Sequence, residues 1–122
     1  MNIKTIRNQN IAIIDTDTKI TNTQDALDLL ASANYHADCI GVVIYKASLE
    51  ESFFDLKTGL AGEIIQKFTN YKMKLAIVGD YSSFSSKSLK DFIYECNKGK
   101  SVYFKSDIAS ALSALVPEDS LD

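Results

Sequence analysis

Two acidic residues, Asp15 and Asp17, stand two positions apart directly after an apolar run at residues 11–14. Carboxylates at the end of a strand can hold Mg²⁺, and one of them can attack a phosphate as a nucleophile. Asp80, which follows a second apolar run at residues 75–78, is a candidate for a further metal ligand. The spacing therefore allows a Mg²⁺-dependent phosphatase. Because Asp and Thr are also ordinary turn and capping residues, a structural role is the alternative.

The tetrapeptide DTDT at residues 15–18 is similar to the DxDxT signature of haloacid dehalogenase-type phosphatases. That family normally brings a second acidic residue soon after a later Gly-Asp pair. Here Gly79-Asp80 is followed by Tyr-Ser-Ser-Phe, without such a residue. The departure favours a binding function over catalysis, and the phosphatase is kept as the alternative.

A second group of candidate residues stands where a loop enters a predicted helix: Asp55, Lys57, Thr58 and Gly59. Backbone N–H groups and the helix dipole favour an anion at such a position, so a small anion or nucleotide is one candidate ligand. The Thr58 hydroxyl is also a candidate phosphate acceptor, and its modification would add about two negative charges. These residues therefore predict a regulatory or ligand-binding surface.

The same residues also have a structural interpretation, in which Asp55 or Thr58 caps the helix. Gly59 and Gly62 would then permit close helix packing. Ser86 lies in a serine-rich stretch at residues 82–88. This stretch is either a ligand loop at the carboxyl edge of a sheet or a loop in which Ser86 caps the next helix.

Composition limits the classes of protein that need to be considered. The chain has 122 residues, 46% hydrophobic and 24% charged, which fits one globular domain. A net charge of −3 lacks the basic footprint of a nucleic-acid binder. The sequence shows no signal peptide and no apolar run near the ~20 residues of a membrane span. Two cysteines and one histidine fall short of the about four ligands of a zinc site.

From these limits we expect no metal, no cofactor, no nucleic-acid partner and no membrane partner. The two cysteines, Cys39 and Cys96, are expected to be reduced thiols in the cytoplasm. The tyrosines and phenylalanines mostly fall at core spacings, and we therefore do not expect them to form stacking platforms.

Strand-like and helix-like segments alternate along the chain. Residues 3–7 and 11–14, joined by Asn-Gln-Asn, predict an antiparallel hairpin. Continuous apolar runs at residues 40–45, 75–78 and 102–104 predict strands buried on both faces. Helical periodicity separates and follows these runs. The order ββαβαβαβα predicts an α/β domain with a mixed, mostly parallel sheet of four to five strands and packed helices.

Local signals refine the helices. Thr21 and Gln24 have capping-box spacing, and Leu27, Leu30 and Ala31 form the expected buried stripe of the first helix. Gly99 suits a left-handed helix cap. We expect a core containing residues from every element, namely Ile13, Leu30, Val43, Ile44, Ile64, Phe68, Ile77, Val78, Phe92, Phe104 and Leu112.

Three segments resemble an uncharacterised bacterial family, domain of unknown function 4180. They are DLKTGLAGEIIQKF at residues 55–68, LAIVGD at 75–80 and SKSLKDFIYECNKG at 86–99. The resemblance covers nearly the whole chain but implies no activity.

The element order also resembles the STAS domain, the fold of anti-sigma-factor antagonists. Those domains have a D-S-S-G-like segment before a helix, with the phosphorylated serine just before the glycine. The segment DLKTGL at residues 55–60 corresponds to it, with Thr58 at the phosphoacceptor position. Thr replaces Ser, and Leu-Lys separates Asp55 from Thr58, so this sequence departs from the pattern at the regulatory residue itself.

Taken together, residues 1–116 are expected to form one domain and residues 117–122 a flexible tail. The leading hypothesis is a non-catalytic, STAS-like regulatory module that binds a protein partner around Thr58. The first hairpin strand is an exposed edge, which leaves pairing with a second copy open.

Overall fold

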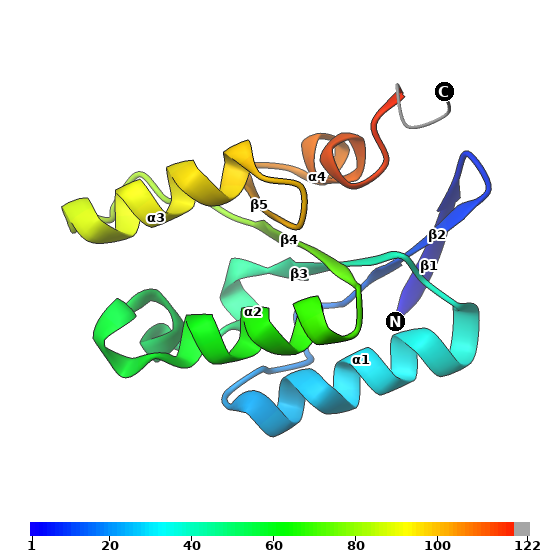
Figure 1. The fold of residues 1–122 in the computed structure, drawn as a ribbon, viewed down its shortest axis with the longest axis horizontal. Coiled ribbons are helices and arrows are strands. Elements are labelled where there is room, and N and C mark those ends of the chain that lie inside the picture. Colours follow the sequence, from blue (N-terminus) through cyan, green and yellow to red (C-terminus); the bar gives the residue numbers. More distant parts are fainter. Residues whose placement is uncertain (119–122) are drawn as a thin grey trace.

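The structure is a computed structural model that describes residues 1–118, apart from the side chain of His36. The predicted order ββαβαβαβα is confirmed (Figure 1). The proposed tail at 117–122 lies outside the described residues from position 119 onward. The strands are β1 (Asn2–Ile6), β2 (Gln9–Ile13), β3 (Gly41–Tyr45), β4 (Lys74–Val78) and β5 (Val102–Lys105), and the helices are α1 (Thr23–Ala37), α2 (Leu60–Asn70), α3 (Lys87–Lys98) and α4 (Ile108–Leu115).

All five strands form one sheet in the order β1-β2-β3-β4-β5. β1 pairs antiparallel with β2, and the remaining neighbours are parallel. The hairpin turns at Arg7 and Asn8, whose φ angles of 49° and 64° suit the tight two-residue turn that matches strand twist. The turn therefore lies earlier than the predicted Asn-Gln-Asn, because Gln9 and Asn10 already pair with Ile6 and Thr5.

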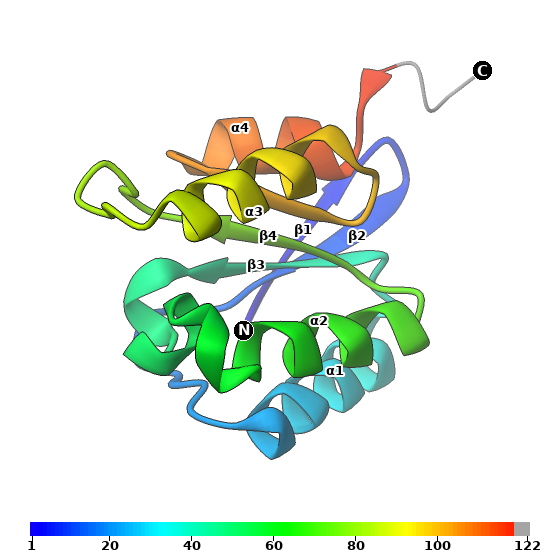
Figure 2. The same cartoon turned by 60° about the vertical axis from the view of Figure 1, so that its left-hand side comes forward.

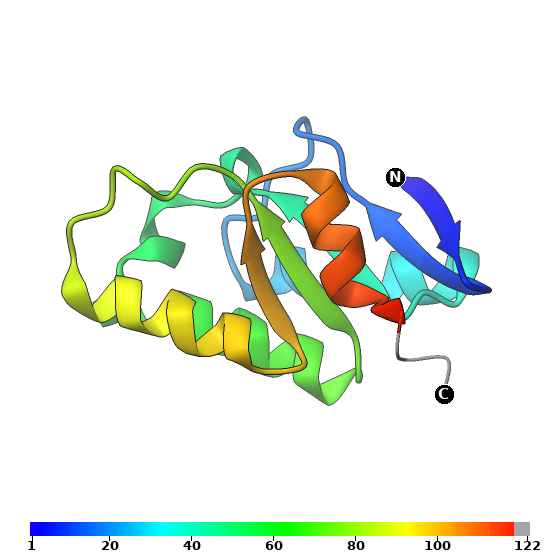
Figure 3. The same ribbon diagram turned by 90° about the horizontal axis from the view of Figure 1, so that it is seen from above.

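Helices cover the two faces of the sheet unequally. The strands advance in one direction through right-handed crossovers, which places α1, α2 and α3 against one core. In Figures 1 and 2, α1 and α2 lie side by side below the sheet, and α4 lies on the other side. α3 runs along the edge strand β5 and joins the same core as α1 and α2. Figure 3 shows the β1–β2 hairpin extending beyond α4.

The predicted core is largely confirmed. Eight of its eleven members are buried, and three, Ile13, Phe92 and Leu112, are half-buried at the margins. In α1, however, Ala31 is exposed and Leu27 only half-buried. The buried stripe of α1 is instead formed by Ala26, Leu29, Leu30 and Ala33.

Two predicted caps are wrong in detail. α1 begins one residue later than the Thr21–Gln24 spacing indicated, because the side chain of Asn22 accepts a hydrogen bond from the Asp25 N–H at 2.9 Å. Gly99 ends α3 with φ −85°, outside the left-handed region, and its N–H donates to the Cys96 carbonyl. Extended backbone at Gly99 leads the chain directly toward β5.

Candidate functional site

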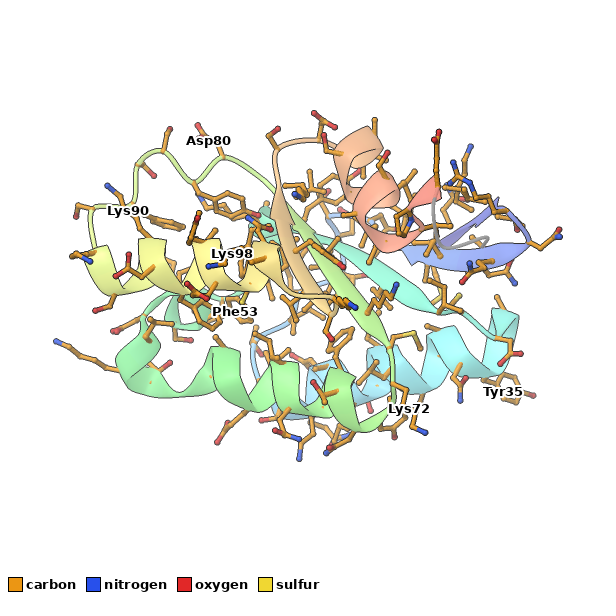
Figure 4. All side chains as sticks on the ribbon, turned by 45° about the horizontal axis from the view of Figure 1, so that its top comes forward. Tyr35, Phe53, Lys72, Asp80, Lys90 and Lys98 are labelled. Carbon is orange, nitrogen blue, oxygen red and sulfur yellow. The ribbon has the colours of Figure 1, made fainter. Side chains whose placement is uncertain are left out.

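The segment between β3 and α2 is more ordered than the loop that the sequence predicts. It contains three short 3-10 helices, η1 (Lys46–Ser48), η2 (Glu51–Phe54) and η3 (Leu56–Thr58). The Ile20 N–H donates to the Ser48 carbonyl at 2.8 Å, which ties the segment to the loop after β2. Phe53, only 1% exposed, anchors η2 in the core between α2 and α3 (Figure 4). Such long-range contacts leave no local sequence signal.

Thr58 is exposed, yet its hydroxyl is fully engaged at the corner between η3 and α2. The Oγ1 hydroxyl lies 2.7 Å from the Ser52 carbonyl and 2.9 Å from the Asp55 carbonyl, and it can donate its proton to either. It also accepts a hydrogen bond from the Leu60 N–H at 3.2 Å. Gly59 follows with φ +78°, a left-handed conformation that favours glycine. The hydroxyl therefore holds η2, η3 and α2 together.

The other predicted residues of this group take capping roles. Asp55 accepts a hydrogen bond from the Lys57 N–H at 3.2 Å and so caps η3. Ser86 caps α3 by accepting from the Leu89 N–H, also at 3.2 Å. Ser86 belongs to a different element from the Thr58 corner, although both loops lie at the carboxyl edge of the sheet. The ligand-binding part of these predictions stays a prediction.

A groove of about 870 Å³ runs between α1 and α2 beside the Thr58 corner. Its lining is mostly polar or small: Asn22, Thr23, Gln24, Leu27, Gly59, Gly62, Glu63, Gln66 and Lys67. A Cβ atom placed on Gly59 or Gly62 would meet no heavy atom within 4 Å. The structural interpretation that these glycines permit close helix packing is therefore wrong, since both face open space.

A second hollow, the aromatic pocket, has a volume of about 620 Å³ and lies beside η1 and η2. It is lined by Lys46, Ala47, Leu49, Glu51, Phe54, Asp55 and Phe84. The rings of Phe54 and Phe84 lie with their centroids 5.1 Å apart, and Tyr81 packs against both. These half-buried rings come from the short helix η2 and the loop after β4, where α-helical or strand periodicity assigns no face. Core spacing predicts that most aromatic residues are buried and does not indicate this pocket; the two adjacent phenylalanines, Phe53 and Phe54, are the available signal.

Lys46 is held in place at the rim of the aromatic pocket. Its ammonium group donates to the Asp80 carbonyl at 2.7 Å and lies 4.6 Å from the centre of the Phe84 ring. A Cβ on Gly79 would come within 2.5 Å of the Lys46 Cβ, so the glycine makes room for this side chain. Tyr81 packs against the Phe84 ring, and its hydroxyl donates a hydrogen bond to the Ile77 carbonyl at 2.7 Å. Burial raises the pKa of Tyr81, which keeps this hydroxyl protonated.

The three carboxylates of the phosphatase alternative are not assembled into a metal site. Asp15 lies 3.3 Å from the Thr18 hydroxyl and 3.7 Å from the terminal amino group. Asp80 lies on the loop after β4 (Figure 4) and accepts from the Ser82 N–H at 2.9 Å. Hydrogen bonding by the Ser82 side chain and then by its N–H lowers the pKa of Asp80. β3 separates β4 from β2. Within residues 1–118, no three His, Cys, Asp or Glu residues are grouped to hold a metal.

The thiols also lack the properties of nucleophiles. Cys39 and Cys96 are both free, the first buried and the second half-buried. Burial is the main cause that raises the pKa of each thiol, which favours the unreactive protonated form. The side chain of His36, the single histidine, lies outside the described residues.

Fold and site together define a mixed α/β domain with two ligand-sized hollows that share one ordered connection, the segment from β3 to α2. Residues 6–115 match the family described as Domain of unknown function (DUF4180), and the chain belongs to that family. No curated protein and no solved structure matches the chain. None of the helices in the described part is long and apolar enough to cross a membrane.

Proposed function

We propose that this domain is a non-catalytic regulatory module that binds a protein partner in the groove between α1 and α2. Its element order, like that of the STAS domain, supports this class. The free, weakly acidic thiols agree with a cytoplasmic location, where such groups stay reduced.

The observation on which the proposal depends is the open space above Gly62. Glycine inside a helix destabilises it by about 1 kcal/mol relative to alanine. Within residues 1–118 no close contact offsets that cost, because a Cβ at Gly62 would meet no heavy atom within 4 Å. A partner that approaches the backbone of α2 closely would explain a glycine at this place. The neighbouring Gly59 extends the same bare surface toward Thr58.

Control of this surface at Thr58 follows from the bonds of its hydroxyl. A phosphate on Oγ1 would remove the proton that is donated to the carbonyl of Ser52 or Asp55. It would also add about two negative charges near Glu63, which lines the groove. Phosphorylation would therefore loosen the corner and change the charge of the docking surface at the same time.

Gly62→Gln tests the docking surface, because it fills the groove with a good helix former. Ser110→Ala is the matched control: Ser110 is exposed, and like Gly62 it is the third residue of its helix, but α4 lies on the other face. Both variants and the wild type are used as baits in a cell extract, and retained proteins are identified by mass spectrometry.

We expect one protein to be retained by the wild type and by Ser110→Ala, and to fall at least about ten-fold with Gly62→Gln. Thr58→Glu should reduce it as well. Gly62→Ala separates binding from folding, since it should raise the free energy of unfolding by up to about 1 kcal/mol. A partner retained equally by all variants, or no partner at all, would show that the groove is not the docking surface.

A further inference from the structure

The aromatic pocket is a second site, independent of the proposed docking groove. We propose that it binds a small aryl-alkyl ammonium compound, with the aromatic group on Phe54 and Phe84 and the cation toward Glu51 and Asp55. Its volume of about 620 Å³ falls within the range of small-molecule sites, about 300–1,000 Å³.

The apolar part of the argument rests on rings that the fold leaves half-exposed. Phe54 and Phe84 are tilted by 33° to each other and form one wall with Leu49 and Ala47. Tyr81 and Phe53 hold them from behind, with ring centroids 6.2 Å from Phe84 and 5.0 Å from Phe54. A planar ring of a ligand gains both apolar burial and offset or edge contacts on such a wall.

Charge decides which aromatic compound fits. Glu51 and Asp55 provide two negative charges to the lining and Lys46 provides one positive charge, so the pocket is negative by one. Glu51 and Asp55 form no ion pair with any residue in the described part of the chain. The Lys46 ammonium group keeps its charge, but the Asp80 carbonyl and the Phe84 ring hold it in place. The excess of one negative charge in the lining therefore favours a cation over an anion.

Three probes of nearly equal size separate these contributions: 2-phenylethylamine, 2-phenylethanol and 3-phenylpropionate. Each is titrated into the isotopically labelled full chain, and the backbone amide shifts are followed by NMR. We expect the amine to bind with a Kd on the order of 1 mM, as befits a fragment. The alcohol should bind about two- to five-fold more weakly, because the carboxylates are exposed, and the propionate weaker still. The shifts should centre on residues 46–55 and 81–84.

Variants assign the preference to particular groups. Glu51→Gln combined with Asp55→Asn leaves only the Lys46 charge in the lining and should abolish the advantage of the amine over the alcohol. The amide oxygen introduced at position 55 can still cap η3. Glu63→Gln, an exposed carboxylate of the other hollow, is the matched control and should leave the amine preference unchanged. Phe84→Leu keeps an apolar side chain but removes the ring, and it should weaken all three probes.

Three results would overturn the proposal. Binding of the propionate as tight as that of the amine would mean that Lys46, not the carboxylates, sets the preference. Shifts confined to residues outside the pocket, or no shift with any probe, would mean that the rings form no ligand site. None of these outcomes bears on the α1–α2 groove, whose test uses Gly62 and a protein partner.

Discussion

The two hollows flank one segment of chain but are shaped in opposite ways. The groove between α1 and α2 has bare backbone at Gly59 and Gly62, and most of its other lining residues have polar side chains. The aromatic pocket is lined by the rings of Phe54 from η2 and Phe84 from the loop after β4. A bare backbone suits a partner that approaches closely, whereas a wall of rings suits a small apolar ligand. The difference indicates two separate binding events on one ordered connection.

Phe53 lies in the core and packs against Phe54 of the aromatic pocket, so Phe53→Ala should have the largest effect. The side chain is 1% exposed, and its loss should lower the free energy of unfolding by about 3–5 kcal/mol. Chemical denaturation measures this change. The matched control is Tyr94→Ala, whose ring is 63% exposed and which should stay within about 0.5 kcal/mol of wild type. An intact groove and pocket in a Phe53→Ala protein would show that the two hollows do not depend on this anchor.

Thr58 connects the two hollows, and Thr58→Val should have the next largest effect. Valine keeps the shape but loses both the donated and the accepted hydrogen bond, at a cost of about 1–2 kcal/mol. We expect faster amide hydrogen exchange in residues 51–60 and altered shifts in both hollows. Thr58→Ser retains the hydroxyl and should restore wild-type exchange. Changes in exchange and shifts that are limited to residues of the groove would contradict the prediction that Thr58 connects the two hollows.

The N-terminus of α1, at one end of the groove, should respond weakly to acid. The Thr21 N–H and hydroxyl, both 2.9 Å from the Asp25 carboxylate, lower the pKa of Asp25 below its ordinary value of 3.8. A lowered pKa stabilises the fold above pH 3.8, and the contribution is lost as the pH falls through the lower folded value. The free energy of unfolding should therefore exceed that of Asp25→Asn near neutral pH, and the gap should close in acid.

Denaturation of both proteins at about pH 6 and about pH 3 measures this difference. Thr21→Val removes one of the two donors and should narrow the gap at neutral pH. A gap that widens in acid would contradict the sign of the pKa shift. The aromatic pocket contains neither Thr21 nor Asp25 and should bind 2-phenylethylamine equally in Asp25→Asn.

The sequence by itself determined the element order, the parallel sheet and most of the core. A continuous apolar run such as residues 75–78 is buried only in a strand whose sheet is covered on both faces. The buried stripe of α2 through Ile64 and Phe68 repeats at helical spacing. Caps at Ser86 and Asp107 could also be predicted, because a side chain bonding three residues ahead is a local interaction. The start of α2 was predicted only approximately, because its N-cap is Gly59, which has no side chain to bond, and not Asp55 or Thr58.

Only the tertiary structure decided what lies around that helix start. The aromatic pocket joins Phe54 to Phe84, thirty residues later, and Lys46 reaches its position because Gly79, directly after the neighbouring strand β4, makes room. The open space above Gly62 depends on where α1 lies relative to α2, and the separation of Asp15 from Asp80 depends on β3 lying between their strands. Contacts between distant segments depend on how whole elements pack, and no local pattern of residue types encodes them.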